Sequence, residues 1–324
     1  MNKNPYQPLR FRPLLRSYIW GGQRLSTLLQ KSHPSKEPLA ESWEIVDLGE
    51  HQSRLIDSPW AGMPLHELVT EHGESLLGVN SPQESFPLLF KYLDCRLNLS
   101  IQVHPNDQRA ARLDPPGRGK TEAWVVLEAE AKSRIYAGLK QGVGREEFIA
   151  SLQQGNIDST LHWFEPGIGD CILVPAGCVH ALGAGLLVAE IQQSSDTTYR
   201  LFDWNRLGSD GQPRPLHLEA GLEAIDFEVG PVMPQIPIAT DSPQRETLVD
   251  CPSFVLDRFT LQRPETIGGD GHCRILSVLA GEVEVGGEQP LKLARGETCL
   301  VPAAAGAQTV VPASKSIVLS ARQP

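Results

Sequence analysis

Short apolar runs recur along the whole chain, and most of them end at a glycine, a proline or a polar pair. Runs of about four to eight apolar or alternating residues that are bounded in this way predict β-strands. We expect such strands at residues 5–20, 41–48, 55–57, 86–93, 100–104, 121–127, 134–139, 171–174, 185–192 and 197–203, and several more between residues 254 and 320. We expect helices only at residues 64–77, 145–154 and 216–225. The pattern therefore predicts an all-β dominated fold with a few short helices.

One strand-ending motif occurs twice. Gly169 is followed after five residues by Pro175, and the same spacing, with nearly the same filling, leads from Gly296 to Pro302. Two copies of one β unit are the simplest explanation. The first copy continues to His180, whereas the second continues with AAAGAQ and has no histidine there. We therefore expect the second unit to be structural and the first to carry any site.

The chain length and a proline-rich stretch indicate two domains. A chain of 324 residues has room for about two domains of roughly 150 residues. Residues 230–246 contain four prolines and have the composition of an extended connection. The sequence therefore predicts one domain at residues 1–230, with small helical insertions, and a second at residues 231–324.

A polar pair interrupts the predicted strand that begins at residue 100. Gln102 and His104 are two residues apart, so they point to the same face, while Ile101 and Val103 point to the other. Pro105 follows directly and ends the strand, because proline has no N–H for the ladder. Two candidate ligand side chains therefore stand side by side at the end of a strand.

Composition and charge limit the possible partners. The net charge of −10 argues against a nucleic-acid surface or an acidic membrane, which would need a basic patch. It leaves room for a small anion, because a few local cations suffice for one phosphate. We expect no membrane span, since no run approaches about 18 apolar residues. The six cysteines form no CxxC pair and the N-terminus lacks a signal-peptide core, so we expect reduced thiols in a cytoplasmic protein.

The remaining ligand candidates come from the first copy of the repeat. A G-x5-P-x-G-x2-H pattern ends at His180, and Glu122 lies on the earlier predicted strand at residues 121–127. With the Gln-x-His pair, this resembles the two motifs of the cupin barrel, in which a histidine pair, a glutamate and a later histidine hold one divalent metal. In this chain a glutamine replaces the first histidine, and the glutamate follows an inserted loop at residues 108–119. The seven other histidines have no partners at ligand spacing, and we interpret them as ordinary surface or core residues.

Four motifs in order resemble the type I mannose-6-phosphate isomerase family, in its short bacterial form. They are QVHPND at 102–107, GKTEAW at 119–124, PAGCVHALG at 175–183 and EIQQSSDTTYRLFDW at 190–204. The resemblance covers essentially the whole chain. It implies two cupin-like β-barrel or jelly-roll units, the second degenerate and metal-free. It also implies a zinc-dependent aldose-ketose isomerase that interconverts D-mannose 6-phosphate and D-fructose 6-phosphate through a cis-enediol(ate).

The resemblance assigns the metal ligands and one catalytic cation. His104, Glu122 and His180 match the family's zinc positions, with Gln102 as the fourth ligand and one Zn²⁺ per chain. A set of ligands with both nitrogen and oxygen donor atoms suits a catalytic zinc ion. Arg200 matches the family's catalytic arginine. An arginine suits the stabilisation of enediolate oxygens, because it stays charged and offers forked donors.

Proton transfer between C1 and C2 also needs a base. Glu190 and Asp196 are the carboxylates nearest to Arg200 in the sequence, and the sequence does not choose between them. Lys120 shares a strand face with Glu122 if the strand begins early enough, and it is a candidate for substrate contact or ring opening.

Ser100 and Lys91 are the candidate substrate-binding residues, and the candidate donors to the phosphate are Ser100, Lys91 and Arg200. A lysine in a buried strand usually turns its ammonium group outward, although Lys91 could also face a polar pocket. The expected partner is a small sugar phosphate, and we expect a monomer or a weak homo-oligomer.

Two other classes of protein remain open. A non-catalytic sugar-binding cupin would keep the metal as a structural element, but it would have no need of Arg200, Lys120 and two carboxylates. A cupin dioxygenase would need open positions for O₂ and usually a histidine-rich iron site. The oxygen donors Gln102 and Glu122 favour zinc and a redox-neutral reaction, and metal analysis would separate the classes.

Overall fold

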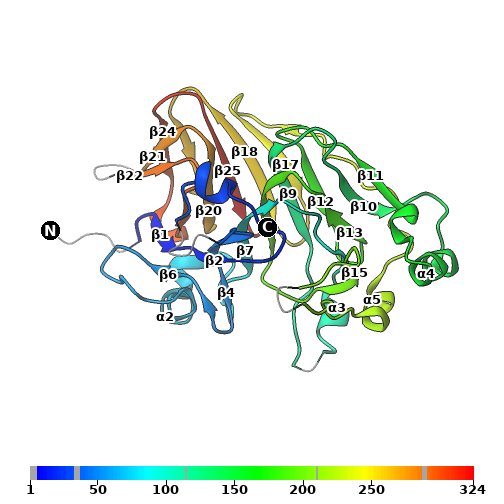
Figure 1. The fold of residues 1–324 in the computed structure, drawn as a ribbon. Coiled ribbons are helices and arrows are strands. Elements are labelled where there is room, and N and C mark those ends of the chain that lie inside the picture. Colours follow the sequence, from blue (N-terminus) through cyan, green and yellow to red (C-terminus); the bar gives the residue numbers. More distant parts are fainter. Residues whose placement is uncertain (1–5, 33–36, 114, 209–210, 287–289) are drawn as a thin grey trace.

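The computed structural model describes residues 6–32, 37–113, 115–208, 211–286 and 290–324. It consists mostly of antiparallel β-sheets with a few short helices, as the apolar pattern predicts. Two sheet-rich halves lie side by side, one with the orange and red strands of the C-terminal part and one with the green strands (Figure 1).

Two sheets form the half that carries the candidate site. One has the order β12-β9-β14-β7-β3-β2, with strands β2 (Leu14–Arg16), β3 (Glu41–Ile45), β7 (Leu88–Cys95), β9 (Glu122–Ala129), β12 (Cys171–Val174) and β14 (Leu186–Gln193). The other has the order β11-β10-β13-β8-β15, with strands β8 (Ile101–Val103), β10 (Ile135–Leu139), β11 (Leu161–Phe164), β13 (His180–Leu182) and β15 (Tyr199–Phe202). A buried apolar cluster joins Trp124 and Val126 of the first sheet to Ile135 and Leu182 of the second. The two sheets therefore pack face to face.

The other half repeats this two-sheet arrangement. Its larger sheet has the order β16-β17-β18-β25-β20-β23-β1-β6, with strands β16 (Ile238–Ala239), β17 (Arg245–Asp250), β18 (Val255–Leu261), β25 (Ser316–Arg322), β20 (Arg274–Ala280), β23 (Thr298–Val301), β1 (Leu9–Arg12) and β6 (Arg54–Leu55). The smaller has strands β19 (Glu265–Ile267), β24 (Gln308–Pro312), β21 (Glu282–Val285) and β22 (Leu291–Ala294). Phe259 and Leu276 pack against Val283 and Val310 between them.

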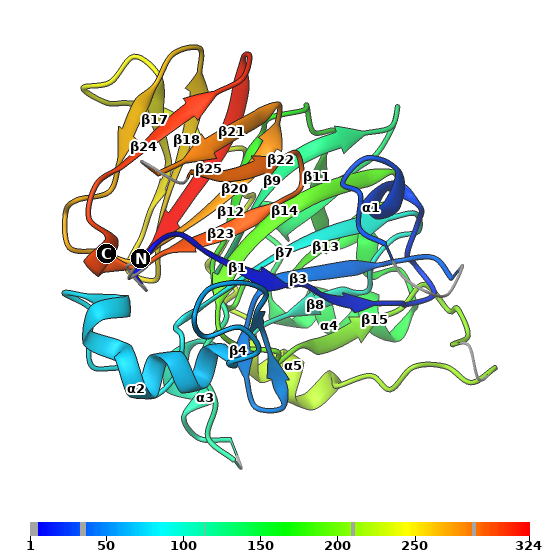
Figure 2. The same ribbon diagram turned by 90° about the vertical axis from the view of Figure 1, so that its left-hand side faces the viewer.

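The helices are short and lie at the edges of the sheets (Figure 2). They are α1 (Arg24–Thr27), α2 (Leu65–Leu77), α3 (Asp107–Ala110), α4 (Arg145–Gln153) and α5 (Leu218–Ala224), with 3₁₀ turns η1 (Ile157–Thr160) and η2 (Ala303–Ala305). A small hairpin consists of β4 (Asp47–Leu48) and β5 (His51–Gln52). The three predicted helices are confirmed as α2, α4 and α5. None of the helices in the described ranges is long and apolar enough to cross a bilayer.

The sequence repeat corresponds to a repeated strand arrangement. Strand β9 lies between β12 and β14, and β20 lies between β23 and β25 in the same way. Gly169 and Gly296 begin the two turns with φ values of 91° and 87°, a conformation that favours glycine over residues with a Cβ. The same turn therefore precedes an equivalent strand in each half, β12 in the first and β23 in the second.

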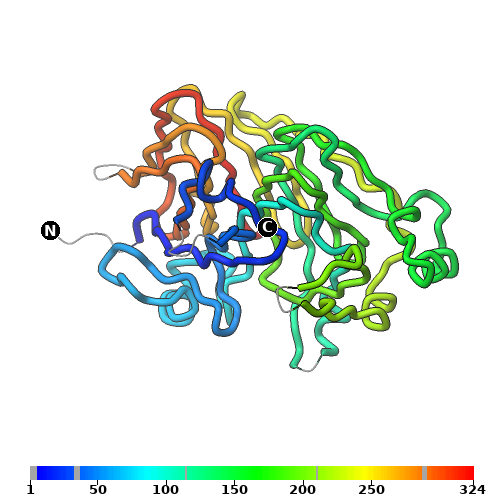
Figure 3. Tube along the Cα trace, in the orientation of Figure 1, coloured from blue at the N-terminus to red at the C-terminus, as the bar shows by residue number. Residues whose placement is uncertain are grey.

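The N-terminal segment crosses into the C-terminal half. Of the strand predicted at residues 5–20, residue 5 lies outside the described part, and the rest contains β1 and β2. Strand β1 pairs with β23, with Leu9 opposite Leu300, and Figure 3 follows the blue segment into the orange and red region. One buried cluster includes Leu187 and Phe90 from the first half together with Leu256 from the second. The two halves thus share one apolar core. The domain boundary that the sequence predicts at residue 230 stays a prediction.

Candidate metal centre and active-site pocket

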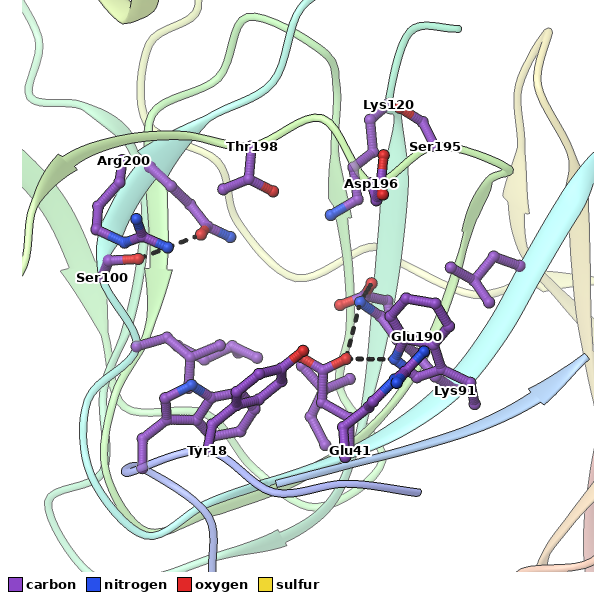
Figure 4. Close-up of a pocket in the computed structure, with 18 of the residues that line it drawn as sticks. Tyr18, Glu41, Lys91, Ser100, Lys120, Glu190, Ser195, Asp196, Thr198 and Arg200 are labelled. Carbon is purple, nitrogen blue, oxygen red and sulfur yellow. Dashed lines mark hydrogen bonds and ion pairs between the residues drawn. The ribbon is translucent and has the colours of Figure 1, made fainter. Parts of the chain in front are cut away.

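A pocket of about 400 Å³ opens in the first half, between its two sheets and the N-terminal segment (Figure 4). Most of its lining is polar, and it includes seven of the ten residues that the sequence singles out: Lys91, Ser100, Gln102, Lys120, Glu190, Asp196 and Arg200. The other three, His104, Glu122 and His180, form a buried cluster that contacts two of these lining residues, Gln102 and Lys120.

Strand pairing brings the cluster together. His180, the first residue of β13, pairs directly with Gln102 on β8, and Glu122 begins β9. His180 Nε2 lies 3.2 Å from Glu122 Oε1, and His104 Nε2 lies 3.5 Å from Glu122 Oε2. One ligand atom from each of the three residues can be chosen so that all lie within 4.8 Å of one another.

Backbone carbonyls orient both imidazoles. His104 Nδ1 lies 2.9 Å from the carbonyl oxygen of Thr197, and His180 Nδ1 lies 2.9 Å from that of Cys178. A carbonyl accepts only from a protonated nitrogen, so each Nδ1 carries the hydrogen and each Nε2 presents a lone pair to the cluster. This is the arrangement that metal-ligating histidines usually have.

Electrostatics hold the three residues in the protonation states that a metal requires. Burial and the Lys120 charge lower the pKa of His104 to about 3, and burial lowers the pKa of His180. Burial alone would raise the pKa of Glu122, but the charge of Lys120 lowers it well below its usual value. Two neutral imidazoles and one carboxylate result, which is a ligand set suited to a divalent cation.

The cluster fits a metal ion on a further ground. Both carboxylate oxygens of Glu122 are buried. Lys120 compensates Oε2 at 2.8 Å, but Oε1 faces only the lone pair of His180 Nε2 at 3.2 Å in the described part of the chain, and a buried carboxylate oxygen without a donor is costly unless a cation compensates it. Gln102 Nε2 lies 3.2 Å from His180 Nε2, so its side chain reaches the same centre. An amide oxygen and nitrogen are interchangeable by a flip of the group, and Gln102 as the fourth ligand stays a prediction.

Lys120 points into the cluster although it precedes the first residue of β9. Its Nζ lies 2.8 Å from Glu122 Oε2 and 3.1 Å from His104 Nε2, and its side chain is buried. It also lines the pocket. The structure therefore places Lys120 between the candidate metal ligands and the space for a substrate.

Lys91 also faces the pocket, and it does not turn outward as buried-strand lysines usually do. Its ammonium group lies 3.0 Å from Glu190 Oε1 and 3.7 Å from Glu41 Oε2. Glu190 Oε2 accepts a hydrogen bond from Trp124 Nε1 at 2.9 Å. Burial and the Glu122 charge raise the pKa of Glu190, although Lys91 opposes the shift. Lys91 and Glu190 are thus a buried ion pair, shown with Glu41 on one side of the pocket in Figure 4.

Arg200 and Ser100 lie on the opposite side (Figure 4). Arg200 is half-buried and donates from Nη1 to the carbonyl of Pro215 at 2.9 Å. Burial lowers the pKa of its guanidinium, and the neighbouring Arg214 lowers it further. Asp196 is exposed at the pocket, and within the described ranges its carboxylate accepts no hydrogen bond.

Sequence reasoning missed one wall of the pocket. Arg16, Tyr18 and Trp20 line it. The two-residue spacing of Arg16 and Tyr18 was a usable signal, because alternate residues of an extended segment share a face, whereas Trp20 lies in a turn. His51 also lines the pocket, with its Nδ1 2.8 Å from Arg16 Nη2. Interpreting it as an ordinary histidine was incomplete, since only tertiary packing brings it there. Arg214 belongs to no recognisable motif and lines the pocket as well.

Comparisons with known proteins agree with this geometry. A family model described as phosphomannose isomerase type I, catalytic domain, matches residues 9–122. The mannose-6-phosphate isomerase ManA of Bacillus subtilis is 32% identical over 304 residues, covering 91% of this chain and 93% of the relative. A mannose-6-phosphate isomerase of Streptococcus mutans is 34% identical over 299 residues, covering 91% and 92%. The crystal structure of a mannose 6-phosphate isomerase from Bacillus subtilis superposes with a TM-score of 0.90 at 28% identity, covering 97% of this chain and 99% of that one.

Proposed function

Because the chain belongs to the family of type I phosphomannose isomerases, we propose that it interconverts D-mannose 6-phosphate and D-fructose 6-phosphate with one zinc ion per chain. The observation that carries the proposal is the buried His104, Glu122 and His180 cluster beside a polar pocket of about 400 Å³. A redox-neutral isomerisation needs a base that moves the proton and a group that stabilises the enediolate, for which a metal ion or a fixed cation near the reacting carbons is suited. The pocket offers candidates for each.

The proposed ligands are His104, Glu122 and His180, with Gln102 as the fourth. When bound, zinc would polarise an oxygen of the open-chain sugar. Lys120 lies against both His104 and Glu122, so its ammonium group can donate a hydrogen bond to a sugar oxygen next to these ligands. Two neutral imidazoles and one carboxylate are a common ligand set of catalytic zinc, and metal analysis of the purified protein distinguishes zinc from iron, which binds the same set.

Arg200 is proposed to stabilise the enediolate. Removal of the proton from C2, before it is delivered to C1, leaves one negative charge shared by the C1 and C2 oxygens, and a guanidinium can donate to both. Arg200 Nη1 is anchored on the Pro215 carbonyl, which fixes the group before the substrate arrives. Such prepositioned donors lose little energy to reorganisation during the reaction.

The two candidate bases have different surroundings. Glu190 is engaged on both oxygens, by Lys91 and by Trp124. The Asp196 carboxylate accepts no hydrogen bond among the described residues, and it lines the same pocket. We therefore assign the proton transfer to Asp196 and the charge compensation of Lys91 to Glu190. Lys91 and Ser100 remain the proposed substrate-binding residues, Lys91 at the sugar and Ser100 beside the arginine side of the pocket.

Turnover measurements test the proposal. The zinc-loaded protein should convert mannose 6-phosphate to fructose 6-phosphate, and Arg200→Lys should lower kcat by about 100-fold or more, because an ammonium group lacks the planar fork of donors that a guanidinium presents to two neighbouring oxygens. Circular dichroism and thermal unfolding of the variant provide the control for folding. An absence of turnover in the zinc-loaded wild type would contradict the proposed reaction.

A further inference from the structure

Positive charge is unevenly distributed around the pocket. Lys91 lies 3.0 Å from Glu190 and 3.7 Å from Glu41. Arg16 lies over the same Trp43 ring as Lys91, so two cations and two carboxylates leave this side of the pocket with no excess of positive charge. Arg200 and Arg214 line the other side. A dianionic group would therefore be attracted to the arginine side.

Asp203 holds Arg214 in a fixed orientation. Arg214 Nε donates to Asp203 Oδ2 at 2.7 Å, and Arg214 Nη2 donates to Oδ1 at 2.5 Å. This two-point contact is the strongest geometry that an arginine and a carboxylate form. The Asp203 side chain is 6% exposed and that of Arg214 is 23% exposed. The aspartate is thus anchored in the protein, while part of the guanidinium reaches the pocket surface.

A second arginine completes the anchor. Arg206 donates to Asp203 Oδ1 from Nε at 3.0 Å and from Nη2 at 2.7 Å, and its Nη1 donates to the Asn98 carbonyl at 2.5 Å. All three nitrogens of Arg206 are therefore used inside the protein, and Arg206 is not part of the pocket lining. In Arg214 the nitrogens that donate to Asp203 are Nε and Nη2, so within the described part of the chain Nη1 is available to a ligand.

Arg214 is also tied to Arg200. The residue after Arg214 is Pro215, whose carbonyl accepts from Arg200 Nη1 at 2.9 Å. His217 N donates to the Arg200 carbonyl at 2.8 Å. Two guanidinium groups are thus fixed beside one another in the pocket wall with a single carboxylate behind them. Such an arrangement of like charges is unfavourable unless an anion balances it.

We propose that Arg214 is a substrate-binding residue that contacts the phosphate of the sugar phosphate, and that Asp203 is the positioning residue that aims it. The inference rests on the proposed function and deepens it. The phosphate lies at Arg214, and the sugar carbons extend past Arg200 toward Lys120 and the metal ligands, so Arg200 keeps its proposed place beside the enediolate oxygens. Charge-assisted, forked donors are what phosphate recognition requires.

Steady-state kinetics and phosphate inhibition test this assignment. Arg214→Gln should raise KM for mannose 6-phosphate by about 10-fold or more while kcat changes less than about threefold, because the contact is equal in ground and transition states. The inhibition constant of inorganic phosphate should rise in parallel. Arg214→Lys should recover part of the loss, since it keeps the charge. Asp203→Asn should also raise KM for mannose 6-phosphate, because Arg214 is still present but is no longer held in its orientation by the carboxylate.

A matched control comes from the C-terminal half. Arg245 pairs with the buried Asp257 at 3.0 Å and is 32% exposed, and it does not line the pocket. Arg245→Gln therefore removes a similar arginine–aspartate pair, and its KM should stay within about twofold of wild type. An Arg214→Gln variant that raises KM no more than Arg245→Gln would overturn the assignment. An inactive wild type would instead count against the proposed reaction, and phosphate binding measured by calorimetry would still test Arg214.

Discussion

At the scale of single residues, two carboxylates in one pocket have opposite surroundings. Glu190 is 3% exposed and is engaged by Lys91 and Trp124, whereas Asp196 is exposed. A buried ion pair is costly to break, because it leaves the partner charge uncompensated. A carboxylate without hydrogen bonds is instead available to move a proton. The same chemical group thus has a structural task at one position and a reactive task at the other.

Paired substitutions separate these tasks. Asp196→Asn should lower kcat by about 100-fold or more with little change in the melting temperature, since removal of a general base costs roughly 10²–10⁴-fold. Glu190→Gln should lower the free energy of unfolding by about 3 kcal/mol, because Lys91 then keeps only the more distant Glu41. Kinetics and chemical denaturation of both variants provide the comparison. If Glu190→Gln had the larger loss of kcat and an unchanged stability, the assignment of the base would be reversed.

The individual site residues were predictable to different degrees. Gln102 and His104 share a face because strand side chains alternate, and this followed from their spacing alone. Lys120, Glu122 and His180 followed from motifs. Arg214 had no such signal, because its place in the pocket depends on a carboxylate, Asp203, that packing brings to it. Neighbours that meet only through tertiary contacts are not visible in local patterns.

At the scale of elements, the turn before β13 positions one candidate metal ligand. Gly177 has a φ of 88°, and its amide donates to the His104 carbonyl at 2.9 Å. A Cβ at this position would lie 2.9 Å from the Cβ of Asp226. The turn therefore links His104 to the strand that begins with His180, and it has no space for a side chain.

An alanine at this turn should be costly. Gly177→Ala should lower the free energy of unfolding by about 2–3 kcal/mol, from the positive φ and the contact with Asp226 together. Gly142 has a φ of 85°, and a Cβ there would meet no atom of the described residues within 4 Å. Gly142→Ala therefore carries the conformational cost alone, about 1 kcal/mol. Urea unfolding of both variants measures the difference. Equal losses of unfolding free energy in Gly177→Ala and Gly142→Ala would show that the contact with Asp226 contributes nothing.

Most elements were predictable because glycine and proline mark their ends. The repeated turns at Gly169 and Gly296 begin equivalent strands, as the shared spacing indicated. The helix at residues 64–77 followed from its apolar spacing, and the structure has it as α2. Strand partners were harder to predict. The pairing of β1 with β23 joins residues nearly a whole chain apart, and no local pattern specifies such a partner.

At the scale of the whole molecule, the shared core predicts one cooperative unit. Buried residues of both halves, such as Leu187 and Leu256, belong to a single apolar cluster, and β1 is part of the C-terminal sheet. Thermal unfolding followed by calorimetry should therefore show a single transition. Free zinc at 100 times its Kd should stabilise the protein by about 2.7 kcal/mol. Two transitions separated by several degrees would contradict the shared core.

The most direct test of the central claim is the dependence of turnover on zinc. Chelation of the purified protein should abolish the conversion of mannose 6-phosphate to fructose 6-phosphate, and about one equivalent of zinc per chain should restore it. Glu122→Gln should bind zinc at least 10-fold more weakly, because it loses the anionic ligand of the cluster. Full activity in protein that metal analysis finds free of metal would contradict the account, because His104, Glu122 and His180 would then have no catalytic metal to hold.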